Sequence, residues 1–136
     1  MPGFSDQFPW PSYYGNYDYF ENRMARHQKV AELTAEGDGV YRLRRTRGDV
    51  LRLFICECYA FGVADYIETT GKLGHLDLVI INSAWCGYSP DAKRYCRDES
   101  VGLFEIGELM GALHRDDYWN YLTKRETDLF RKNGWL

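Results

Sequence analysis

Glu57 is the residue that most clearly invites chemistry, because it is an ionisable side chain inside a segment that otherwise has the pattern of a buried strand. Within residues 50–59 it shares one strand face with Leu51, Leu53, Ile55 and Tyr59. An ionised carboxylate is costly to bury unless it is hydrogen-bonded, paired or bound to a metal ion. The pattern therefore predicts that Glu57 is a metal ligand, a general base or the buried partner of an arginine.

The surrounding elements would place Glu57 in the middle of a sheet. Residues 50–59 and 76–82 have the pattern of strands that flank a helix over residues 63–73, which is typical of a sheet buried on both faces. The other expected elements are strands at 40–45 and 101–106 and helices at 18–35, 89–98, 107–114 and 116–131. The sequence therefore predicts an α/β (α+β) fold, a small mixed β-sheet of about four strands flanked by helices.

The length of 136 residues predicts a single domain over residues 1–136. Residues 1–16 are expected to form an aromatic, proline-rich arm, and residues 17–136 the α/β core with its C-terminal helix. The arm either packs its aromatic rings on the core or provides a contact for a protein partner or a second copy of the chain. A second candidate contact surface is the last helix, through Tyr118, Trp119 and Tyr121.

The order of helix, hairpin, carboxylate-bearing strand, helix and buried strand resembles the core of the restriction-endonuclease-like, or PD-(D/E)xK, nuclease superfamily. The closest resemblance is to its Mrr-type branch, and it covers residues 37–113. The segments that carry it are LDLVIINS at 76–83, YSPDA at 88–92 and LFEIGEL at 103–109. The resemblance implies a restriction-endonuclease-like fold.

The resemblance also implies a function and a set of site residues. Glu57 takes the acidic position of the (D/E)xK motif, Tyr59 stands where the family has lysine, and the first acidic residue is Asp49 or Asp38. In the family such carboxylates hold Mg²⁺, which activates water for DNA cleavage. The chain is thus expected to bind or cleave DNA as a metal-dependent phosphodiesterase. Because the lysine is missing, the alternative is a non-catalytic interaction module, a pseudoenzyme subunit of a defence or viral assembly.

A cluster of arginines on the predicted hairpin is a second candidate site. Arginines on a two-stranded ribbon can hold phosphates and stack on bases. The net charge of −3 argues against a general polyanion binder, so the alternative is a charged edge that resists aggregation. The predicted nucleic-acid-binding residues are Arg42, Arg44, Arg45, Arg47 and Arg52.

The four cysteines, Cys56, Cys58, Cys86 and Cys96, have no Cys-x-x-Cys spacing, which argues against a zinc site. The sequence shows neither a secretory signal nor an apolar run of membrane-spanning length. These observations predict a cytoplasmic protein with reduced, buried thiols and no membrane partner. Mg²⁺ is then the cofactor that the resemblance implies.

Overall fold

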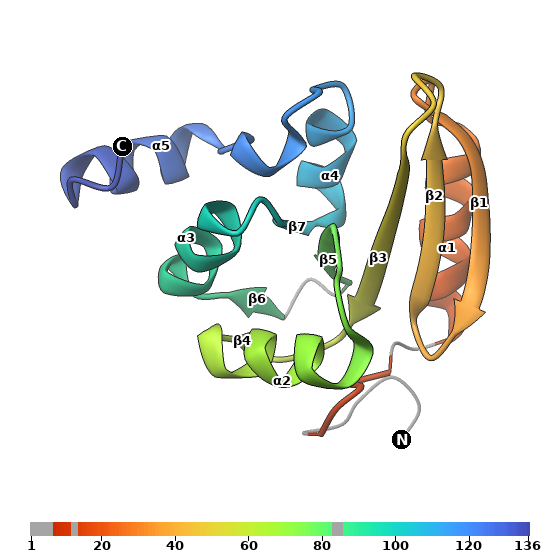
Figure 1. The fold of residues 1–136 in the computed structure, drawn as a ribbon, viewed down its shortest axis with the longest axis horizontal. Coiled ribbons are helices and arrows are strands. Elements are labelled where there is room, and N and C mark those ends of the chain that lie inside the picture. Colours follow the sequence, from red (N-terminus) through yellow and green to blue (C-terminus); the bar gives the residue numbers. More distant parts are fainter. Residues whose placement is uncertain (1–6, 12–13, 83–85) are drawn as a thin grey trace.

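The computed structural model describes residues 7–11, 14–82 and 86–136 of the chain (Figure 1). Within them the chain forms helices, a five-stranded sheet and a two-stranded sheet. The elements up to the middle of the chain are α1 Tyr14–Ala25, β1 Val30–Gly37, β2 Val40–Arg45, β3 Val50–Cys56, β4 Ala60–Phe61 and α2 Val63–Leu73. The remaining elements are β5 Leu78–Ile81, β6 Gly87–Tyr88, α3 Pro90–Asp98, β7 Gly102–Glu105, α4 Ile106–Ala112, the 3₁₀ helix η1 Tyr118–Asn120 and α5 Lys124–Lys132.

The larger sheet is mixed, with the strand order β1-β2-β3-β5-β7. The first three strands form an antiparallel meander, whereas β3, β5 and β7 run parallel. In this register Cys56 lies beside Ile81, which in turn lies beside Glu105. The carboxyl ends of the three parallel strands therefore meet at one edge of the sheet, where parallel sheets commonly present ligand-binding residues.

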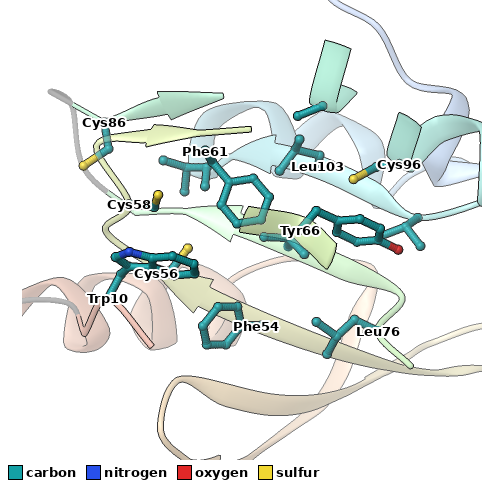
Figure 2. Packing of buried hydrophobic residues seen from close by; sticks show 14 of the residues in the cluster. Trp10, Phe54, Cys56, Cys58, Phe61, Tyr66, Leu76, Cys86, Cys96 and Leu103 are labelled. Atoms are coloured by element: carbon teal, nitrogen blue, oxygen red, sulfur yellow. The ribbon is translucent and has the colours of Figure 1, made fainter. Parts of the chain in front are cut away.

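Both faces of the parallel strands β3, β5 and β7 are largely buried, which explains why these strands are apolar on both sides. The first face packs against α2 and α3 and includes Trp10, Phe54 and Cys56 (Figure 2). The opposite face packs against α1 and α4, with Phe20 of α1 and Leu109 of α4 in its core. The predicted α/β fold class, a small mixed sheet flanked by helices, is confirmed.

The prediction of one helix over residues 18–35 is wrong. The helix ends at Ala25, and Val30–Gly37 forms the edge strand β1, so the sheet has five strands where about four were expected. Apolar residues spaced four apart, Phe20 and Met24, do lie on the buried face of α1. From Val30 onwards, pairing with β2 outweighs the helix propensity of the residues. Most side chains of β1 are exposed.

Most other elements have the predicted positions. Helix α2 spans the predicted residues, and α3 begins as expected, with the Ser89 hydroxyl accepting from the Ala92 N–H and with Pro90 in the first turn. The predicted last helix is divided into η1 and α5, because Thr123 caps α5 through a capping box. Within the described residues, no helix has the length and apolar character that a membrane crossing requires.

The described part of the N-terminal arm packs on the core. Trp10 is buried, with its ring 6.0 Å from that of Phe61, and Phe8 stacks on Phe54 at 5.7 Å. The Trp10 carbonyl also accepts a hydrogen bond from the Glu57 N–H, which holds the arm beside the end of β3. Tyr13 and the side chain of Tyr14 lie outside the residues that are described.

Candidate functional site

Glu57 follows directly after β3, at the edge where the parallel strands end. Its side chain is only 5% exposed, and its Oε1 accepts a 2.5 Å hydrogen bond from Asn16 Nδ2 of α1. The next residue along this edge is Asn82, which is buried after β5 and donates its backbone N–H to the Cys56 carbonyl. The carboxylate is thus buried in a polar setting, as its sequence context predicts, and an amide of α1 is one of its partners.

Asp38 lies at the same end of the sheet as Glu57. It occupies the tight turn between β1 and β2 with a φ of 56°, and the adjacent Gly39 carbonyl accepts the Ile55 N–H at 2.8 Å. The φ of +83° at Gly39, and its close approach to the Ile55 carbonyl, leave no room there for a Cβ atom. The hairpin turn that contains Asp38 is therefore held against the last residues of β3.

Asp49 lies at the opposite end of β3. Asp49 immediately precedes β3, and Glu57 immediately follows it. From Asp49 to Cys56, the last residue of β3, the chain spans roughly 23 Å at the usual rise per strand residue. The carboxylate of Asp49 is bound by the Arg45 guanidinium, which lowers the pKa of Asp49. The prediction that Asp49 and Glu57 share a metal ion is therefore wrong, because the two residues lie at opposite ends of β3.

Tyr59 does not extend the strand face of Glu57. Strand β3 ends at Cys56, so the predicted alternation stops, and Tyr59 is 69% exposed while Glu57 is buried. The two side chains are therefore in different environments. Tyr59 holds the chain in place through its backbone instead, since its carbonyl accepts the Gly87 N–H beside the paired strands β4 and β6.

Carboxylates at this edge of the sheet belong to Glu57 after β3, Asp38 in the β1–β2 turn and Glu105 at the end of β7. Among residues 7–11, 14–82 and 86–136, no group of three His, Cys, Asp or Glu side chains is placed to hold a metal ion. Mg²⁺ is often held by one or two carboxylates, with water and substrate oxygens completing the shell. Glu57 and Asp38, the two of these residues that the sequence analysis names, would supply two such carboxylates.

Comparisons of the chain with protein-family models, with curated proteins and with solved structures found no match.

The arginine ribbon of the sequence prediction is largely paired with acidic residues. Arg42 binds Glu36 at 2.9 Å, and Arg52 approaches the other oxygen of Glu36 at 3.8 Å. Arg44 lies 3.7 Å from Glu32 of β1. Because the edge strand brings two carboxylates alongside these three guanidinium groups, this face of the sheet carries little unbalanced positive charge.

Arg45 and Arg47 do not lie on the exposed face of the hairpin with Arg42 and Arg44. Arg45 is 2% exposed, and its guanidinium donates to both carboxylate oxygens of Asp49 and to the carbonyls of Leu113 and Arg115. The prediction that Arg45 contacts nucleic acid is therefore wrong. Arg45 shares its strand face with Tyr41 and Leu43, so the two-residue period of β2 already indicates that it points inward. Arg47 lies in the following turn, beside Asp116.

The aromatic residues Tyr118, Trp119 and Tyr121 pack, fully or in part, against the core. Tyr118 is buried under the Arg45 guanidinium, 5.3 Å from its ring centroid, and Trp119 packs on Tyr118. Tyr121 packs edge-on against Phe104, with its ring close to Gly111. Tyr118 is therefore part of the core, whereas Trp119 and Tyr121 are half-buried, and a partner surface built from them stays a prediction.

A polar cluster near β7 was not predicted. The Tyr88 hydroxyl lies 2.7 Å from a Glu108 oxygen and 2.6 Å from a Glu126 oxygen, beside a pocket of about 330 Å³ that Glu105 also lines. Lys93 of α3 is buried beneath the Tyr88 ring, and burial lowers its pKa to about 8. No spacing in the sequence indicates this cluster, because its members come from β6, α3, β7, α4 and α5. Its contacts join α5 to the core.

Proposed function

We propose that the protein is a restriction-endonuclease-like protein that binds DNA at the carboxyl edge of its sheet and hydrolyses phosphodiester bonds with Mg²⁺. The observation that carries the proposal is the buried Glu57 carboxylate. It lies at the end of a central strand, held by Asn16 and close to the hairpin turn that bears Asp38. In the sequence, Glu57 takes the acidic position of the (D/E)xK motif of the nuclease superfamily that the chain resembles.

The residues at this edge would divide the work. Glu57 and Asp38 would hold Mg²⁺, which supplies a Lewis acid and lowers the pKa of bound water. The Asn16 amide fixes the orientation of the Glu57 carboxylate. Because both site residues are acidic, a phosphate would be repelled from this edge unless a divalent cation lies between them. Binding at this site is therefore expected to require the metal.

One observation favours a second candidate function. Tyr59, at the position where the resembling family has lysine, is an exposed aromatic residue and not a cation. Lysine in that position orients the nucleophile and neutralises charge. Its replacement is what a nuclease-fold protein without catalysis, acting as an interaction module in a defence or viral assembly, would show.

A cleavage assay separates the two candidates. End-labelled single- and double-stranded DNA is incubated with the protein and Mg²⁺ or Mn²⁺, and products are resolved on a denaturing gel. The wild-type chain is expected to cut, and Glu57→Gln is expected to lose at least about 100-fold in rate, since even outer-shell partners of a metal contribute 10–100-fold. Glutamine can still accept the hydrogen bond from Asn16, so the fold is retained.

The matched control is Glu68→Gln, which makes the same chemical change on α2 at an exposed carboxylate paired with Lys72. This variant is expected to cut at the wild-type rate. If the wild-type chain cuts no DNA with either metal, and neither metal raises its melting temperature, the nuclease proposal fails and the interaction module takes its place.

A further inference from the structure

A groove lies at the end of the sheet opposite Glu57. In Figure 1 the arrowhead of β3 marks the Glu57 end, whereas the turn between β2 and β3 lies at the other end, which is where the groove is found. The groove has a volume of about 410 Å³ and is open to solvent. Its lining residues, from α1, the following turn and α4, are Arg23, Arg26, His27, Gln28, Met110 and His114.

The groove continues past His114 into a smaller depression of about 160 Å³. This second part runs under the β2–β3 turn and adds Lys29, Arg47 and Asp116 to the lining. The Thr46 N–H donates to the Lys29 carbonyl at 2.9 Å, which fixes the turn beside the start of β1. The two depressions share His114 in their linings, so they lie next to each other at this end of the domain.

His27 and His114 both line the larger depression, and His114 also lines the smaller one. Their ring centroids are 4.8 Å apart. Nδ1 of His27 accepts the Lys29 N–H at 3.0 Å, so in the neutral ring the proton is on Nε2, which donates to the Met110 carbonyl at 2.9 Å. His27 is thus fixed between α1 and α4, and it presents its ring together with the exposed ring of His114.

The groove is strongly basic for a chain whose net charge is −3. Arg23, Arg26, Lys29 and Arg47 line it, and Asp116 is the one carboxylate in the described lining. That carboxylate is 84% exposed and binds Arg47 at 2.8 Å. In contrast to the ribbon, where glutamates lie beside the arginines, most of the positive charge here faces solvent without an acidic neighbour in the described lining.

We propose that this groove binds single-stranded nucleic acid through its phosphodiester backbone. The cations are spread along a path and do not converge on one point, which fits a chain of phosphates better than a single anion. The paired imidazole rings on the floor offer a surface on which unpaired bases can stack, and a duplex keeps its bases away from such a surface. This site is independent of the proposed function, because it lies at the other end of the sheet and needs no metal ion.

The same basic residues have another explanation, which the test must separate. They lie near the carboxyl ends of α1 and α4, where cations stabilise a helix by interacting with its dipole. That explanation predicts that their loss lowers the melting temperature and leaves nucleic-acid binding unchanged. The proposed groove predicts that their loss weakens nucleic-acid binding and changes the melting temperature little.

Fluorescence anisotropy with a labelled 12-nucleotide single strand, in EDTA and at several salt concentrations, provides the test. Arg23→Ser/Arg26→Ser is expected to weaken binding at least tenfold at low salt. It should also reduce the slope of log K against log salt by about 1.4, since each phosphate contact to a single strand contributes about 0.7. Two control variants each remove two positive charges elsewhere. They are Arg42→Ser/Arg44→Ser on strand β2 and Arg131→Ser/Lys132→Ser at the end of α5. Both are expected to bind like the wild type.

Several results would overturn the proposal. They are no binding by the wild type in EDTA, an equal loss in all three double variants, a loss in the ribbon variant alone, or equally tight binding of the matching duplex. Displacement of the strand by inorganic phosphate at the same phosphate concentration would also overturn it, because the site would then recognise a single anion. A failed nuclease assay leaves this test unaffected, since EDTA removes the metal on which the Glu57 site depends.

Discussion

Replacing Asp49 by alanine is expected to lower the free energy of unfolding by about 3–5 kcal/mol, because it leaves the buried Arg45 guanidinium without its counter-charge. Arg45 is 2% exposed and holds the end of β2 to the segment after α4 through the carbonyls of Leu113 and Arg115. Asp49 alone supplies the negative charge in this described network, with contacts of 2.6 and 3.0 Å. For a domain of this size the melting temperature should fall by roughly 10–20 °C.

Thermal and urea unfolding check this expectation, with Asp116→Ala as the matched control. Asp116 also binds an arginine, Arg47, but the carboxylate is exposed, so its loss should leave the free energy of unfolding almost unchanged. The result also bears on the metal site. Two results would contradict the structural role of Asp49. One is an Asp49→Ala variant with wild-type stability, and the other is a folded Asp49→Ala variant that binds Mg²⁺ more weakly than the wild type.

The difference between Arg45 and its neighbours shows what a local pattern can predict. The alternation along β2 distinguishes the inward face of Tyr41, Leu43 and Arg45 from the outward face of Arg42 and Arg44. What it cannot predict is the edge strand β1, whose glutamates pair with the outward arginines. Because residues 30–36 contain good helix formers, only their pairing with β2 decides that they form a strand.

The sequence indicates Glu57 and names Asp38 as one of two alternatives for its partner, but it does not indicate Asn16. The carboxylate of Glu57 is conspicuous in the sequence, since apolar residues surround it. The choice between Asp38 and Asp49 follows from the hairpin itself, because antiparallel pairing places Asp38 near the end of β3 and Asp49 at its start. Asn16 carries no such signal, since a residue from a separate helix reaches Glu57 only through tertiary packing.

The sequence could not indicate the basic groove, for a related reason. Its cations come from α1, the turn after it, and the turn between β2 and β3, and no two of these segments form a recognisable motif. Net charge also conceals it, because acidic residues elsewhere outweigh the groove. Charge that is dispersed in sequence becomes a surface only when the helix ends converge.

The protein is expected to unfold steeply as the pH rises above about 9, and buried thiols are the main cause. Burial raises the pKa of Cys58 and of Cys96 to about 12, from an ordinary value of 9.0, and raises the pKa of Cys56 further. Above pH 9 the unfolded chain therefore loses protons that the folded chain keeps. Each thiol then lowers the free energy of unfolding by about 1.4 kcal/mol per pH unit, so that three lower it by roughly 4 kcal/mol per unit.

Lys93 opposes this trend over a limited range. Its buried ammonium has a pKa lowered to about 8 from 10.5, so the folded chain gives up this proton before the unfolded chain does. Between pH 8 and 10.5 this one group stabilises the fold by about 1.4 kcal/mol per pH unit, which offsets about one thiol. Above pH 10 the raised pKa values of Tyr41, Tyr66, Tyr88 and Tyr118 add to the loss, because unfolding releases their protons as well.

Urea unfolding in the presence of a phosphine reductant, at intervals between pH 7.5 and 11, measures the balance. Between pH 9 and 10.5 the free energy of unfolding should fall by roughly 3 kcal/mol per pH unit. Since small domains have only about 5–15 kcal/mol in total, the midpoint of alkaline unfolding is then expected between about pH 10 and 12. A flat profile from pH 9 to 11 would show that the thiols ionise inside the folded protein.

Cys96→Ala tests the origin of the slope, because the cavity it leaves lowers stability equally at every pH while the missing thiol changes only the pH dependence. The slope above pH 9 should become shallower by about 1.4 kcal/mol per pH unit. Lys93→Met should change it in the opposite sense and steepen the fall between pH 9 and 10.5, since the opposing ammonium is lost. Cys96 and Lys93 lie in one buried region, but on unfolding above pH 9 the thiol loses a proton and the amine gains one. The two variants should therefore change the slope of the free energy of unfolding against pH in opposite directions. Equal slopes in both variants and the wild type would assign the alkaline transition to other groups.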